Sequence, residues 1–181
     1  MWIAGEWTDA EDGSTSDVLN PATGEVIATT PKATITDVER CVAASRAALK
    51  SKEWAAMDPA QRGRILQKMA AATYANAKSL AAVESTNNGK TFREALSEIR
   101  YGAWTLEYFA GLSDKIEGST IPVPGSRLNY TLKQPLGVTA HLVPWNFPLQ
   151  LAIRSIAPAL AAGCTVIACL LYTSPSPRDV P

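Results

Sequence analysis

The chain has 181 residues, of which 46% are hydrophobic and 19% are charged, proportions typical of a soluble globular protein. Its 17 basic residues equal its 17 acidic residues, so there is no basic field to attract nucleic acid or an anionic membrane. A chain of this length can bury one sizeable core, and we expect no nucleic-acid partner and no membrane partner.

Targeting and cysteine patterns indicate a cytoplasmic protein with reduced thiols. Residues 1–7 lack the basic and apolar segments of a signal peptide. The apolar stretch 149–171 is interrupted by polar residues and a proline, which argues against a membrane span. The three cysteines, Cys41, Cys164 and Cys169, show no metal-ligand spacing and cannot all pair. We therefore expect free thiols and no metal site.

The N-terminal residues favour strands and turns. Residues 20–24, Asn-Pro-Ala-Thr-Gly, are a turn signal in which Pro21 fixes its own φ and Gly24 accepts a positive φ. The apolar segments on either side of this turn are short and extended in character. An N-terminal hairpin is therefore expected before the first helix.

Three helices are predicted from capping signals followed by apolar residues at helical spacing. The second helix is expected to stop near residues 87–89, Asn-Asn-Gly, and the third near Gly111 or a turn beyond. Their apolar stripes are expected to form the core. The three starts are marked by Thr36 with Glu39, Asp58 with Gln61, and Thr91 with Glu94.

The second half of the chain alternates strands with a helix. Residues 127–134 alternate apolar and polar side chains, which predicts a half-buried strand. Residues 137–143 are more uniformly apolar, as in a strand buried on both faces. A helix is predicted over residues 148–162, and another strand begins at Cys164. A strand, helix and strand in this order form a βαβ unit, which implies a parallel sheet.

The loop between the first of these strands and the helix is the candidate site. In an open α/β sheet, ligands bind at the carboxyl ends of the strands. Here that loop, residues 144–148, places Asn146 between the aromatic residues Trp145 and Phe147. From spacing alone, a buried asparagine satisfied by backbone groups is as compatible with the loop as a functional one.

Several ordered motifs resemble those of the aldehyde dehydrogenase superfamily. The most specific motif is Pro-Trp-Asn-Phe-Pro-Leu at residues 144–149. Similar motifs occur at residues 20–26, 88–90, 137–138, 156–163 and 165–166, and the resemblance covers residues 1–168. It implies an α/β fold: an N-terminal hairpin and helices plus the first βαβ unit of an incomplete Rossmann-like nucleotide-binding domain. Residues 126–135 would be a projecting strand of the kind that forms homo-oligomers.

The resemblance also implies a reaction. Members of the family oxidise an aldehyde to a carboxylate with NAD or NADP, through a thiohemiacetal on a cysteine. Asn146 would donate its side-chain N–H to the oxyanion of that intermediate, which makes it the candidate catalytic residue. The candidate cofactor-binding residues form a wall of the dinucleotide site: Leu142, Val143, Pro144, Trp145 and Asn146.

Two departures from the family pattern limit these implications. Asn87 stands where many members have an aspartate that helps to hold a cation, so no metal is assigned. Cys169 stands where members have a lysine that contacts the cofactor ribose, and the resemblance stops there. We expect residues 169–181 to be a non-family tail, either disordered or translated from a sequencing adapter. The nucleophile and general base would then be absent, and the chain alone inactive.

Two other interpretations are compatible with these motifs. A natural short homologue could be a non-catalytic module that binds a dinucleotide or mediates oligomerisation. The parent could also be a relative that acts on a semialdehyde or makes an acyl-CoA, because such relatives share these N-terminal motifs.

Overall fold

The computed structural model describes residues 1–171, so most of the tail expected from residue 169 onwards lies outside the described residues. At its centre lie two parallel strands, β7 (Val138–Pro144) and β8 (Thr165–Leu171). In their register, Leu142 lies opposite Cys169. The predicted parallel pairing is confirmed, and β8 continues past residue 168.

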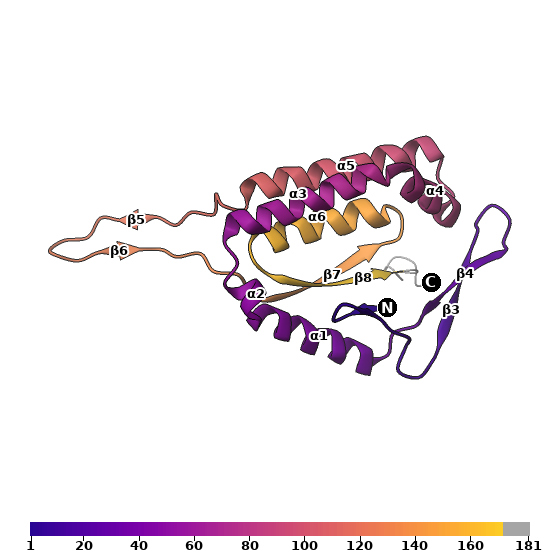
Figure 1. The fold of residues 1–181 in the computed structure, drawn as a ribbon, viewed down its shortest axis with the longest axis horizontal. Coiled ribbons are helices and arrows are strands. Elements are labelled where there is room, and N and C mark those ends of the chain that lie inside the picture. The colour runs from indigo at the N-terminus through magenta and orange to yellow at the C-terminus, as the bar shows by residue number, and fades with distance from the viewer. Residues whose placement is uncertain (172–181) are drawn as a thin grey trace, which may run out of the picture.

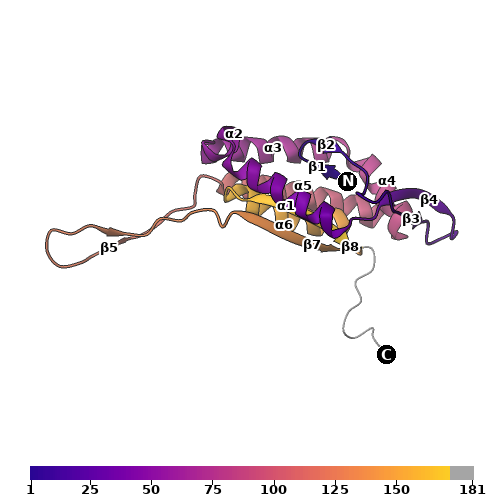
Figure 2. The same ribbon diagram turned by 90° about the horizontal axis from the view of Figure 1, so that it is seen from below.

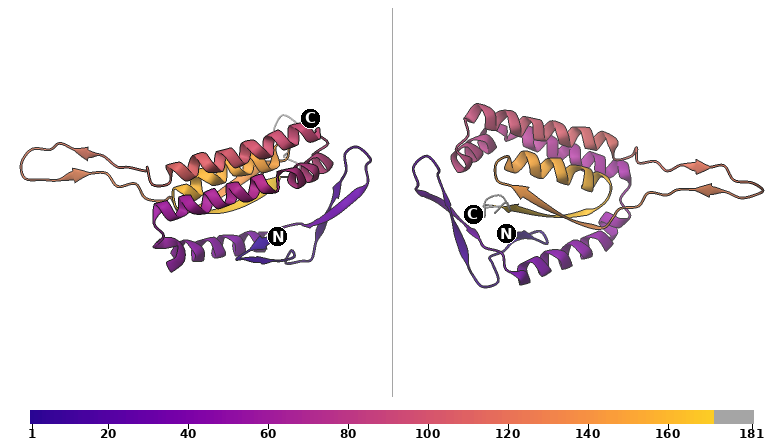
Figure 3. Two further views of the ribbon diagram at one scale, coloured as in Figure 1. Left: turned by 45° about the horizontal axis from the view of Figure 1, so that its top comes forward. Right: turned by 180° about the vertical axis from the view of Figure 1, so that it is seen from behind.

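Helices cover both faces of this strand pair. Helix α6 (Pro148–Ala161) connects the two strands and packs on one face. Helix α1 (Ile35–Lys50) lies on the other face (Figure 1). Beyond α6, α3 (Pro59–Ala75) and α5 (Phe92–Leu112) form a further helical layer (Figure 3). The predicted helix between the strands is confirmed, and Pro158 lies inside it without ending it.

The N-terminal segment forms two antiparallel hairpins, of which the second, around the turn at residues 20–24, is the predicted one. Its turn at residues 20–24 closes with a hydrogen bond of 2.7 Å from the Gly24 amide to the Asn20 carbonyl, and Gly24 has a φ of +75°. The strands are β1 (Trp2–Ile3) paired with β2 (Glu6–Trp7), and β3 (Thr15–Leu19) paired with β4 (Val26–Pro31).

Helix α1 begins one residue before the predicted cap, so the pairing of Thr36 with Glu39 was wrong. Thr34 is the cap, and its backbone amide donates to the Asp37 carboxylate over 2.9 Å. The Glu11 amide also donates to this fully buried carboxylate. These backbone hydrogen bonds, first of all that from Thr34, hold the pKa of Asp37 below its usual range. A contact with the N-terminal segment therefore favours this cap.

The second predicted helix is two helices. Asp58 caps α3 together with Gln61, as predicted, and a short helix, α2 (Lys52–Ala55), precedes it. The helix is interrupted at Asn76, whose side-chain amide donates to the Ala72 carbonyl over 2.8 Å. The expectation of one continuous helix was wrong because an asparagine side chain competes for backbone groups. Helix α4 (Ala77–Asn88) then ends at Gly89, which has a φ of +82°.

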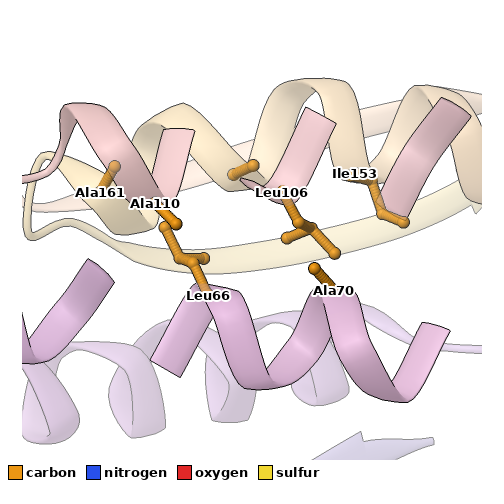
Figure 4. Packing of buried hydrophobic residues seen from close by; sticks show 7 residues of the cluster. Leu66, Ala70, Leu106, Ala110, Ile153 and Ala161 are labelled. Carbon is orange, nitrogen blue, oxygen red and sulfur yellow. The ribbon is translucent and has the colours of Figure 1, made fainter. Parts of the chain in front are cut away.

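The main core joins α3, α5 and α6. Figure 4 shows Leu66 and Ala70 of α3 pointing toward Leu106 and Ala110 of α5, with Ile153 and Ala161 of α6 beside them. The third predicted helix start, Thr91 with Glu94, is confirmed as the start of α5. A Cβ added at Gly63 would lie 2.7 Å from the Ala110 carbonyl oxygen, so only glycine allows α3 this close to α5.

Two hydrogen bonds between residues far apart in the sequence join the α1–α2 segment to β8 and to the turn that precedes it. The Trp54 indole N–H donates to the Gly163 carbonyl over 2.9 Å. The Thr165 hydroxyl donates to the Ser45 carbonyl over 3.0 Å.

A hairpin of β5 (Thr120–Ile121) and β6 (Asn129–Tyr130) projects from the body of the molecule (Figure 2). All of residues 127–134 are exposed, so the expectation of a half-buried strand was wrong for this chain. Within residues 1–171, neither strand of this hairpin packs on a second layer. The alternating apolar side chains therefore face solvent.

Strand β7 is likewise not buried on both faces, which corrects the expectation for residues 137–143. Val143 is 3% exposed, whereas its neighbour Leu142 is 70% exposed. Among residues 1–171 only β8 pairs with β7, and the helices on the two faces leave the Leu142 side chain uncovered. The chain thus has the predicted mixed α/β fold, including a partial Rossmann-like βαβ unit. No helix within residues 1–171 combines the length and apolar character needed to cross a membrane.

Candidate functional site

The candidate site is the loop between β7 and α6, at the carboxyl edge of the strand pair. Asn146 lies in this loop and is exposed, and its side chain makes no hydrogen bond to any other group within residues 1–171. The alternative of a buried asparagine satisfied by backbone groups therefore does not describe this structure. Its amide N–H groups are available to a ligand that approaches from solvent.

Two aromatic side chains flank Asn146. Trp145 keeps about half of its surface exposed, and Phe147 keeps somewhat less. Prolines on either side restrict the backbone, since Pro144 ends β7 and Pro148 is the first residue of α6. The result is an amide group between apolar side chains on a stiff segment.

Two side chains, one from the last residue of α4 and one from the segment between α4 and α5, donate hydrogen bonds to the backbone of the loop. The Asn88 side-chain amide donates to the Trp145 carbonyl over 2.8 Å. The Lys90 ammonium donates to the Asn146 carbonyl over 2.7 Å. Both contacts go to backbone oxygens, so they fix the course of the loop without engaging the Asn146 side chain.

Lys90 is itself held by two acidic side chains. Its Nζ lies 3.0 Å from Glu84 Oε1 on α4 and also contacts Glu98 Oε2 on α5. It sits over the Phe147 ring, 4.5 Å from the ring centroid. Burial raises the pKa of the Glu84 carboxyl, and the hydrogen bond from Lys90 opposes that shift. Sequence reasoning missed this cluster, although residues 88–90 were noted as a motif.

The predicted cofactor wall is placed at the same edge. Leu142, Pro144 and Trp145 are exposed and offer an apolar surface of the kind that a flat ring can pack against. Val143 points the other way, toward an open apolar hollow of about 450 Å³ beside α4 and α6. It can therefore meet a ligand at this edge only through its backbone. Four of the five candidate cofactor residues, Asn146 included, present side chains to solvent.

None of the described cysteines lies in the loop. Cys41 is on α1, and Cys164 is buried just before β8 begins. Cys169 is exposed beside Leu142, two residues short of Leu171, which pairs with Pro144 at the carboxyl edge. Within residues 1–171, no group of three or more histidine, cysteine or acidic side chains is gathered as a metal site.

The geometry is that of a Rossmann-like βαβ unit with a polar side chain presented at its carboxyl edge. A sequence profile of the aldehyde dehydrogenase family matches residues 7–170. The chain belongs to the aldehyde dehydrogenase family.

Individual relatives agree with this assignment. Hydroxyisobutyraldehyde dehydrogenase from Mycolicibacterium austroafricanum is 42% identical over 92% of this chain and 33% of its own length. Retinal dehydrogenase 2 from Mus musculus is 40% identical over 92% and 33%. The crystal structure of betaine aldehyde dehydrogenase from Staphylococcus aureus with NAD+ superimposes with a TM-score of 0.90 at 35% identity, over 93% of this chain and 35% of that one. The chain thus spans about a third of the length of these relatives.

Proposed function

We propose that this chain supplies part of the active site of an NAD(P)-dependent aldehyde dehydrogenase, which oxidises an aldehyde to a carboxylate through a cysteine thiohemiacetal. The observation that carries the proposal is the exposed side-chain amide of Asn146, which makes no hydrogen bond within residues 1–171 and lies on a stiff loop at the carboxyl edge of β7.

The chemistry requires a group like Asn146. When a thiolate adds to an aldehyde carbon, the carbonyl oxygen becomes an oxyanion. A fixed, neutral N–H donor stabilises this developing charge without transferring a proton. Asn146 is suited to this role because no group within residues 1–171 competes for its amide. The thiolate would come from outside this chain, since Cys41, Cys164 and Cys169 all lie away from the loop.

The cofactor would bind along the exposed apolar edge. Leu142, Pro144 and Trp145 would contact it with their side chains and Val143 with its backbone. When bound, NAD or NADP supplies the hydride acceptor. In support, the Staphylococcus aureus relative was solved with NAD+. Leu142 and Trp145 would also limit the access of water to that side of the cofactor.

A chimera tests this function directly. Residues 1–168 of this chain would replace the matching segment of the Staphylococcus aureus betaine aldehyde dehydrogenase. We expect the chimera to form NADH from NAD+ and betaine aldehyde, as measured by absorbance. The isolated chain has no cysteine in the loop to act as the nucleophile, so it is expected to form no NADH above a mock preparation. A folded chimera without turnover would contradict the proposal.

The projecting hairpin favours a second role, in self-association, and the parent would then be a homo-oligomer. Leu128 is 77% exposed, and Tyr130 and Leu132 are exposed beside it. Apolar side chains and unpaired strand edges of this kind favour pairing with another chain.

We expect the purified chain to associate in a concentration-dependent way, and Leu128→Ser to weaken that association. Sedimentation velocity measures the effect. Val83→Ser on α4, where Val83 is also well exposed, is the matched control. Equal association in both variants would show that the hairpin is not the contact.

A further inference from the structure

The Lys90 ammonium is surrounded by more partners than a surface lysine usually has. An ammonium has three N–H donors, and three oxygens lie within 3.0 Å of Nζ, namely those of Glu84, Glu98 and the Asn146 backbone. The side chain is only 11% exposed. Each of the three N–H donors of this largely covered ammonium therefore has an oxygen acceptor.

We propose that Lys90 is a positioning residue, which holds the Trp145–Phe147 loop in place and thereby sets the position of the Asn146 side-chain amide. Glu84 and Glu98 hold Lys90 in turn. This inference rests on the proposed function of Asn146.

The Asn146 side chain has no partner of its own within residues 1–171. The position of its amide therefore depends on the backbone that carries it. The Asn146 carbonyl, in the same residue, accepts from Lys90. Lys90 therefore fixes the backbone of the same residue that carries the side-chain amide, without contacting that amide itself.

Lys90 makes a second contact with the same loop, to the ring of Phe147. A cation 4.5 Å from an aromatic centroid is attracted to the ring face. Lys90 thus contacts two consecutive residues of the loop, while Asn88 holds the carbonyl of the residue before them, Trp145. Of these two tethers, only Lys90 carries a charge.

The acidic pair explains why Lys90 stays in this position. Glu84 is buried on α4, and Glu98 lies on α5, so the ammonium is clamped between two helices that pack together. A buried carboxylate without a partner is strongly destabilising, which opposes any rotamer that withdraws Lys90. Lys90 therefore ties the loop to both α4 and α5, whereas Asn88 ties it to α4 alone.

The test uses the full isotope-labelled chain and NMR relaxation of the Asn146 backbone and side-chain amides. Lys90→Met is expected to lower the order parameter of the backbone amide from about 0.85 to below about 0.6, values typical of rigid and flexible backbone, and to shift the side-chain amide resonances. The Phe147 ring resonances should shift as well. Lys78→Met removes the same charge from an exposed position on α4 and should leave the loop unchanged.

Two further variants separate loop positioning from loss of the fold. In Lys90→Met combined with Glu84→Gln and Glu98→Gln, no carboxylate is left unpaired, so the chain should fold while the loop stays mobile. Lys90→Arg keeps the charge but presents a planar fork, which should restore loop order only in part. Wild-type order parameters in the folded triple variant would overturn the proposal. So would loss of the fold in both methionine variants, since Lys90 would then serve global stability.

The NMR result for Lys90 and the kinetic result for Asn146 can fail separately. If Asn146→Ala has no effect on the chimera, the proposed function fails, while the relaxation result for Lys90 stands. If the loop stays ordered without Lys90 but Asn146→Ala lowers kcat, only the positioning proposal fails.

Discussion

Replacing Asn146 by alanine in the chimera is expected to lower kcat by about 100- to 1,000-fold, the usual effect of removing one oxyanion donor. The loss should fall on kcat more than on the KM for the aldehyde, because the oxyanion forms only as the thiolate adds. Steady-state kinetics with betaine aldehyde measure both constants. Since the side chain is exposed and makes no hydrogen bond within residues 1–171, its removal should leave the fold intact.

Two other variants sharpen this test. Asn146→Asp keeps the shape of the side chain but replaces its donors with a negative charge, so it should lower kcat at least as far. Asn129→Ala changes an exposed asparagine in the distant hairpin and should be neutral. A change of less than about tenfold for both substitutions at Asn146 would remove it from the reaction.

Truncating Leu106 to alanine is expected to cost about 2–5 kcal/mol in the free energy of unfolding, the usual range for a leucine in a packed core. Leu106 is 1% exposed and lies between α3 and α6 in the main core. The cost combines lost burial with the cavity that remains. Urea unfolding followed by circular dichroism measures it in the isolated chain.

Leu112→Ala on the same helix is the matched control for this truncation. Leu112 is 37% exposed at the last position of α5, so the same chemical change should cost about 1 kcal/mol or less. Equal losses at the two positions would show that the α3–α5–α6 core is not closely packed in solution.

Helix starts were predictable where the signal is local. Asp58 with Gln61 and Thr91 with Glu94 were identified because a cap and its partner lie three residues apart. The first helix was misplaced because Thr34 and Thr36 are both suitable caps. With Thr34 as the cap, the Asp37 carboxylate also accepts a hydrogen bond from the Glu11 amide. The spacing of residues within the helix carries no information about this contact.

In the candidate site, too, local features were predictable from the sequence and contacts between distant residues were not. The loop around Asn146 was predictable because its prolines, aromatics and place after a strand are contiguous in sequence. The cluster behind it was not, because 56 residues separate Lys90 from Asn146. The exposure of Leu142 was also missed, since uniform apolarity does not tell how many neighbours cover a strand.

The contacts that hold α1 and α2 against β8 and the turn before it affect the order of folding. The hydrogen bonds from Trp54 to Gly163 and from Thr165 to Ser45 span 109 and 120 residues of the chain. The entropy of closing such loops grows only slowly with length, so stability suffers little. Folding rate is more sensitive to sequence separation. On a ribosome, α1 and α2 emerge long before β8, so they cannot reach these partners until nearly all the described residues have been synthesised.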